Sequence, residues 1–133
     1  MGQQQLLLII LGVIVVGIAV VVGITMFQDN AISANRDAVT NDLVNLGARA
    51  QQYYRRPTSL GGGSNSFTGL TMDKLAGPVG GTSWSNANGT YAIQSNGGTS
   101  IVLDGKGTEK SNGQVVEVTC TVNSDSLTTT VVH

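Results

Sequence analysis

The first pattern along the chain is an unbroken apolar stretch. Residues 6–27, LLLIILGVIVVGIAVVVGITMF, include no charged side chain. A helix of about 20 apolar residues spans the hydrocarbon core of a bilayer. A single segment that enters lipid must be helical, because every backbone amide has to be paired internally. The pattern therefore predicts a helix able to cross a membrane.

The helical pattern continues beyond Phe27 but narrows to one apolar stripe. Charged side chains fall mostly on the remaining surface of this stretch, as in an amphipathic helix. The stripe recurs every seven residues, with two further members on a neighbouring row: Ile32, Val39, Leu46, Tyr53, Leu43 and Ala50. The first proline is Pro57, a natural stop. We expect one helix of about 50 residues, apolar over 1–28 and amphipathic over 29–57, with Gly47 as its weak point.

Residues 58–90 are rich in Gly, Ser and Asn and predict a long loop. Within this loop, LTMDKLA (70–76) predicts one or two helical turns capped by Thr71. Spaced apolar residues are expected to pin the loop onto the helix: Leu60, Phe67, Leu70, Leu75 and Trp84.

From Tyr91 the period changes to two, which predicts strands over 91–133. TYAIQS and SIVLD, joined by Asn96-Gly97-Gly98, form one expected hairpin. QVVEVTCTV and SLTTTVV form the second, and GKGTEKSNG connects the two. The helix stripe and one sheet face should cover each other. The expected fold is α+β, with a long N-terminal helix on a small antiparallel sheet of about four strands.

The apolar helix has three interpretations. A cleavable signal would have a basic n-region and a shorter apolar stretch. A plain membrane anchor normally has flanking Lys or Arg, yet the first basic residue is Arg36. The third interpretation is a helix that packs against copies of itself. Gly12, Gly17 and Gly23 favour this one, because small residues let helices approach closely; they could also permit local unwinding.

Composition and charge exclude several function classes. The 133 residues include 11% charged side chains and have a net charge of -1, which argues against a nucleic-acid binder. The single cysteine, Cys120, excludes an intrachain disulfide, a CxxC redox pair and a cysteine zinc site. Its place in an alternating strand predicts a core residue rather than a nucleophile.

Candidate chemistry is sparse. The one histidine, His133, is terminal and is expected to be exposed. Asp104-Gly105-Lys106-Gly107 resembles a calcium loop but lacks the glutamate and ligand spacing of an EF-hand. Arg55-Arg56 is interpreted as a charge pair at the helix C-terminus. We predict no enzyme activity, no cofactor and no metal. Asn88-Gly89-Thr90 is a sequon, which makes Asn88 a candidate glycosylation site.

The first two residues suggest processing. A start methionine before glycine is normally removed, whereas this chain has Met1 before Gly2. Our hypothesis is that Met1 is an N-terminus made by a peptidase. A basic leader lost in that cut would explain the missing n-region.

Taken together, the pattern resembles the type IV pilin and pseudopilin superfamily. An uncharged apolar N-terminus opens one long helix, followed by a variable loop and a small antiparallel sheet. The resemblance implies that a prepilin peptidase cuts before Met1 and that the new amino group is methylated. It implies storage in the inner membrane, followed by assembly machinery that stacks the subunits into a helical homopolymer at the cell surface.

The chain also departs from that family. The family usually has glutamate at the fifth mature position, thought to attract a neighbour's N-terminal ammonium. Here the position is Gln5, an expected subunit-registry residue that can accept a hydrogen bond without the full charge. The common mid-helix proline is absent, so Gly17 or Gly23 would provide any unwinding. The disulfide that often closes the C-terminal region cannot form.

These features rank the function classes. A structural subunit of a type IV pilus-like filament comes first. A pseudopilin of a type II secretion system shares the same fold, and a monomeric membrane-anchored binding module uses the same anchor. Adhesion, motility, DNA uptake and secretion would all use this subunit plan.

Overall fold

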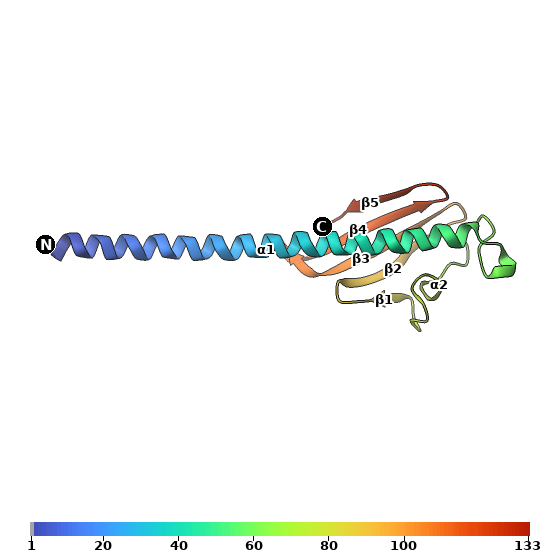
Figure 1. The fold of residues 1–133 in the computed structure, drawn as a ribbon, viewed down its shortest axis with the longest axis horizontal. Helices are drawn as coiled ribbons and strands as arrows, with labels where there is room; N and C mark the ends of the chain where they lie inside the picture. The colour runs from blue at the N-terminus through green and yellow to red at the C-terminus, as the bar shows by residue number, and fades with distance from the viewer. Residues whose placement is uncertain (1) are drawn as a thin grey trace.

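One helix dominates the computed structural model, which describes residues 2–133 (Figure 1). Helix α1 (Gly2–Arg55) has 54 residues, a length of about 80 Å at 1.5 Å per residue. It has no proline, and it remains helical through all of its internal glycines. The predicted continuous helix is therefore confirmed, and the single chain shows no local unwinding at Gly12, Gly17 or Gly23.

The loop after α1 folds back and closes the end of the helix. The last carbonyls of a helix lack partners within it. Here the amide of Gly63 donates to the carbonyl of Tyr53 at 2.8 Å, and the amide of Ser64 donates to that of Arg56 at 2.9 Å. Gly61, at φ 80°, provides the left-handed turn that starts this return.

Five strands follow, in an antiparallel sheet whose spatial order is the chain order. The elements after α1 are η1 (Thr58–Leu60), α2 (Met72–Ala76), β1 (Ser83–Ser85), β2 (Gly89–Asn96), β3 (Ser100–Ser111), β4 (Gln114–Asn123) and β5 (Leu127–Val131). The predicted α+β architecture and both hairpins are confirmed. The fifth strand is β1, which lies inside the expected loop and pairs Trp84 with Tyr91.

The stretch predicted to connect the two hairpins is mostly strand. β3 continues through it to Ser111 and turns into β4 at Asn112-Gly113. Both turn residues have positive φ, 52° and 80°, as a two-residue type I′ hairpin requires. The expected connection between the hairpins is therefore strand over 105–111 and a tight turn only at Asn112-Gly113.

The β3–β4 pairing is interrupted between Lys106 and Lys110. Within this interruption, the backbone of β3 is hydrogen-bonded to the side chain of Asn35 on α1. The Asn35 Oδ1 atom accepts hydrogen bonds from the amides of Thr108, at 3.1 Å, and Glu109, at 3.3 Å. Its Nδ2 atom donates to the carbonyl of Asn88 at 2.9 Å. α1 thus fixes the far end of the sheet through polar as well as apolar contacts.

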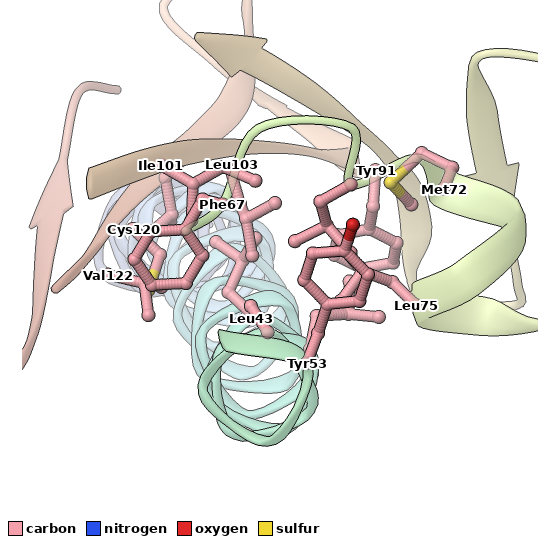
Figure 2. Packing of buried hydrophobic residues seen from close by; sticks show 14 of the residues in the cluster. Leu43, Tyr53, Phe67, Met72, Leu75, Tyr91, Ile101, Leu103, Cys120 and Val122 are labelled. Carbon is pink, nitrogen blue, oxygen red and sulfur yellow. The ribbon is translucent and has the colours of Figure 1, made fainter. Parts of the chain in front are cut away.

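The core is a single apolar layer between α1 and one face of the sheet (Figure 2). The helix contributes Val39, Leu43, Leu46, Ala50 and Tyr53, all at most 9% exposed, with Ile32 partly buried at the edge. The sheet contributes Tyr91, Ile101, Leu103, Val116, Val118, Cys120 and Val122, all 0% exposed. The predicted stripe and its partner face are confirmed.

At Gly47 the α1 backbone lies close to side chains of the sheet. A Cβ atom there would collide with the Leu127 side chain and lie 3.1 Å from Val122 Cγ2. The predicted weak point in the helix is thus also a site of close approach to β4 and β5.

The long loop is held mainly by the predicted anchors. Phe67, Leu70 and Leu75 are at most 3% exposed. Leu60 is 69% exposed, so its predicted anchoring role was wrong. Met72 is buried in its place, and Thr71 precedes α2 without a capping hydrogen bond from its side chain.

Candidate membrane and assembly surface

The first half of α1 extends beyond the sheet, and nothing in the described chain covers it (Figure 1). Every large apolar side chain from Leu6 to Phe27 is between 50% and 76% exposed. Such side chains surround the helix rather than forming one stripe, so no single partner surface in a monomer could bury them. A continuous apolar surface of this kind marks an interaction with lipid or protein.

The same half has the length and composition of a membrane span. Its most apolar 18-residue window has a mean hydropathy of 3.3 and is 0% buried. The hydroxyl of Thr25 donates to the carbonyl of Val21 at 3.0 Å, which satisfies that polar group within the helix. α1 is therefore long and apolar enough to anchor the chain in a membrane.

Three glycines make shallow notches in this apolar surface. A Cβ atom at Gly12, Gly17 or Gly23 would meet no other atom within 4 Å. Packing inside the subunit therefore does not require a glycine at these positions. They remain available for a second helix to approach closely, as small residues allow in membranes.

The expected registry residue lies near the start of α1. Gln5 is exposed in the first turns of the helix, where no acidic residue is present. The first four amides of any helix lack intrahelical partners, so this end presents donors without a local acceptor charge. Met1, the predicted processed residue, lies outside the described residues.

The sequon asparagine is part of a polar network between α1 and the sheet. Asn88 Nδ2 donates to Asp42 Oδ2 at 2.9 Å, as does Asn86 Nδ2. The hydroxyl of Tyr91 donates to the same oxygen at 2.6 Å. A sugar on Asn88 would use the nitrogen that makes one of these bonds, so glycosylation would compete with the network.

This network shifts the pKa values of Asp42 and Tyr91. Burial alone raises the pKa of Asp42, but the hydrogen bonds from Asn86, Tyr91 and Asn88 outweigh it and lower that pKa below 3.8. Burial, and then the Asp42 carboxylate, raise the pKa of Tyr91 above its ordinary 10.0. Asp42 is thus held as an anion that accepts three donors.

The calcium-loop candidate and the single cysteine both lie in strands of the sheet. Asp104-Gly105-Lys106-Gly107 lies within β3 rather than in a loop, and residues 2–133 include no group of three His, Cys, Asp or Glu side chains placed to hold a metal. Cys120 is fully buried, and burial raises the pKa of its thiol to about 11. This confirms its interpretation as a core residue.

The C-terminal histidine was predicted to be exposed, but it is half-buried and held against the sheet. The amide of His133 donates to the carbonyl of Glu117 at 3.2 Å, and its Nε2 atom lies 3.9 Å from Glu117 Oε2. The two arginines at the end of α1 diverge. Arg55 Nη2 donates to the carbonyl of Ser124 at 3.3 Å, whereas Arg56 lines a hollow with Lys74.

Sequence and structure comparisons give no relative for this chain: no known protein family, curated protein or solved structure matches it. The site is therefore judged on its own geometry. That geometry is an apolar helical rod joined without a break to a small folded domain.

Proposed function

We propose that this chain is the structural subunit of a type IV pilus-like filament at the cell surface. The observation that carries the proposal is the all-round exposure of the apolar half of α1. In a single-pass precursor this half lies in the inner membrane. In the filament, the same half of many copies forms a shared core, with the sheet domains outside.

The driving force for assembly is burial of this surface. Seventeen large apolar side chains between Leu6 and Phe27 are exposed. Burying one such side chain contributes roughly 1.5–3 kcal/mol, so a shared core would gain on the order of tens of kcal/mol per subunit relative to water. Assembled helices would therefore stay together once they leave lipid.

Two further features favour copies of this chain as the partner. The glycine notches permit close helix contact, and no Lys or Arg precedes Arg36 to fix the segment at a membrane surface. A prepilin peptidase, N-methylation of Met1 and an assembly machinery complete the proposal, on the resemblance described above. Peptide mass spectrometry of the native N-terminus tests the processing step, with one added methyl group as the expected result.

The first experiment is electron microscopy of the native full-length protein. We expect fibres with helical symmetry, and subunits that need detergent to remain dispersed. A monodisperse subunit without detergent would contradict the proposal, because it would mean that the apolar half needs no cover.

A substitution separates a filament subunit from a monomeric anchor. Gly17→Leu adds bulk to a notch while keeping the segment apolar, and Ile18→Leu serves as the matched control. A lipid-facing helix would accept both changes. A tightly packed core would reject the first, because added volume in a close contact costs about 1–3 kcal/mol. We expect Gly17→Leu to insert into membranes normally but to yield far fewer fibres than Ile18→Leu.

If Gly17→Leu and Ile18→Leu give equal fibre yields, Gly12→Leu and Gly23→Leu are tested in the same way. If all three leucine variants assemble like the parent, close helix packing at the notches is wrong. If all variants and the parent give only membrane-bound particles, the chain is a monomeric anchored module.

A further inference from the structure

A basic hollow lies where α1 ends and α2 folds against it. It has a volume of about 370 Å³ and is lined by Arg49, Gln52, Tyr53, Arg56, Gly61 and Lys74. Three of these six side chains are cationic and none is acidic. This is notable in a chain with only seven Lys and Arg residues and a net charge of -1.

The fold brings the three cations together from two elements. Arg49 and Gln52 lie near the end of α1, and Arg56 directly follows the last residue of that helix, Arg55. Lys74 comes from α2. Its Nζ atom donates to the carbonyl of Gly69 at 3.0 Å and lies 5.2 Å from the centroid of the Tyr53 ring.

No carboxylate neutralises this cluster. Across residues 2–133 the one ion pair within 4.0 Å joins His133 to Glu117, on the sheet. Asp73, the acid next to Lys74 in sequence, accepts hydrogen bonds from the amides of Val79 and Gly80 through Oδ1. Asp42 lines the adjoining hollow with Arg49, but its Oδ2 atom already accepts three donors.

The end of the helix does not repel an anion as strongly as a bare C-terminus would. Its partial negative charge resides on carbonyls without partners. Here the amides of Gly63, Ser64 and Asn65 donate to the carbonyls of Tyr53, Arg56 and Tyr54. These carbonyls therefore do not need the arginine side chains as donors. Arg49 donates to a carbonyl only through Nη1, to that of Leu75 at 2.9 Å, which leaves its other N–H groups available.

We propose that this hollow binds a phosphate group, either inorganic phosphate or a phosphate monoester. Planar guanidinium groups donate pairs of hydrogen bonds that match phosphate oxygens. Two arginines and one lysine also match the charge of about -1.5 to -2 on a phosphomonoester at neutral pH. The glutamine side chain adds an uncharged donor to the same face. This binding site is independent of the proposed filament function.

The lipid headgroups of the anchoring membrane are not the source of the phosphate. Arg56 is 29 residues after Phe27 and directly follows the end of α1, so about 40 Å of helix axis separates the two. When residues 6–27 are in lipid, the hollow is far above the headgroups of that membrane. The phosphate is thus free in solution, or it belongs to a molecule other than these lipids.

The test uses the full chain in a non-ionic detergent and titrates inorganic phosphate by NMR or calorimetry. The three cations are exposed, so we expect millimolar affinity that falls with added salt. Arg56→Gln should weaken binding roughly fivefold, the scale of one exposed charged contact. Arg56→Lys should restore part of the loss.

Arg55→Gln is the matched control, since Arg55 points to Ser124 on the sheet side. Arg56 makes no side-chain hydrogen bond within the described chain, so its replacement leaves the fold intact, which the thermal midpoint checks. Equal phosphate affinity in the two variants would overturn the site, as would no binding by the parent at tens of millimolar phosphate.

Two further arms identify the source. Glycerol phosphate should compete with inorganic phosphate, with the same dependence on Arg56. Anionic vesicles added to the anchored protein should not compete. Binding that appears with vesicles but not with either soluble phosphate would assign the hollow to lipid and overturn the proposal.

Discussion

At the scale of single residues, two aspartates of the domain have pKa values that are shifted in opposite directions, although burial raises both. Three donors lower the pKa of Asp42. In Asp104, on β3, the Oδ1 atom is buried and accepts no hydrogen bond. Burial, followed by the charge of Glu117, raises the pKa of Asp104 above 3.8, and Lys106 offsets only part of this.

The raised pKa gives a prediction with a definite sign. A carboxyl group whose pKa is higher in the folded state stabilises the fold less as pH rises through that range. The penalty therefore grows as pH rises above 3.8, and below 3.8 it disappears. Asp104→Asn should therefore raise the urea midpoint at pH 7 and leave it unchanged at pH 3. The control is Asp125→Asn, on an exposed turn, which should shift neither midpoint.

Asp42 predicts the reverse behaviour. A lowered pKa stabilises the fold above the ordinary pKa, and this contribution disappears as pH falls through the folded value. Asp42→Asn should therefore destabilise the domain at pH 7 and have less effect near pH 2. Urea denaturation at both values measures the difference, and a loss that is equal at the two values would mean that the charge of Asp42 contributes nothing.

Gly105 is the glycine whose replacement should affect the core most directly. A Cβ atom there would lie 2.9 Å from Val39 Cγ1 and 3.0 Å from Tyr91 Cδ1. Overpacking of this kind costs about 1–3 kcal/mol, so Gly105→Ala should lower the free energy of unfolding by that amount. Gly81→Ala is the control, since nothing lies within 4 Å of its Cβ position. Chemical denaturation in detergent compares the two variants.

At the scale of elements, the second half of α1 should depend on one stripe. Leu43 is 0% exposed and its neighbour Val44 is 40% exposed. Truncating a buried leucine to alanine costs about 2–5 kcal/mol, whereas a surface change costs less than about 0.5 kcal/mol. Leu43→Ala should thus unfold the domain at far lower urea than Val44→Ala. Similar midpoints would mean that the stripe does not hold the sheet.

The elements that the sequence predicted are those with strong periodicity. The seven-residue spacing from Ile32 to Tyr53 and the alternation from Tyr91 are visible without any contact information. β1 has only three residues, two of them serine, so its pattern is too short to detect. The second half of β3 is polar, and its path depends on Asn35, a residue more than 70 positions away. The Asn112-Gly113 pair was the signal that could have revealed its turn.

At the scale of the whole molecule, a substitution in the apolar half of α1 should affect membrane binding without affecting the stability of the sheet domain. Val16 is 63% exposed and lies in the half of α1 that the sheet does not reach. An aspartate in mid-membrane costs about 2.5–3.5 kcal/mol, so Val16→Asp should reduce the membrane-bound fraction. The thermal midpoint of the domain should not change. Ala48→Asp, on the exposed side of the second half, should leave membrane binding unchanged, and fractionation with calorimetry measures both effects.

The candidate sites differ in how far apart their residues are in the sequence. The apolar helix and its glycines are consecutive in sequence, so composition was enough to predict the surface. The basic hollow combines Arg49 and Arg56 with Lys74 from another element, and no spacing in the sequence predicts that meeting. Arg55-Arg56 was interpreted as one charge pair, whereas Arg55 donates to the carbonyl of Ser124 and Arg56 lines the hollow.

The chain order of the core has a consequence for the time course of folding. The helix stripe is complete at Tyr53, but its partner face is complete only with β4 and β5, which end at Val131. Ribosomes add about 5–20 residues per second, so the interval between these two points is on the order of ten seconds. During that interval the strands already made cover only part of the stripe, so the apolar side chains of α1 are open to premature association until β4 and β5 are complete.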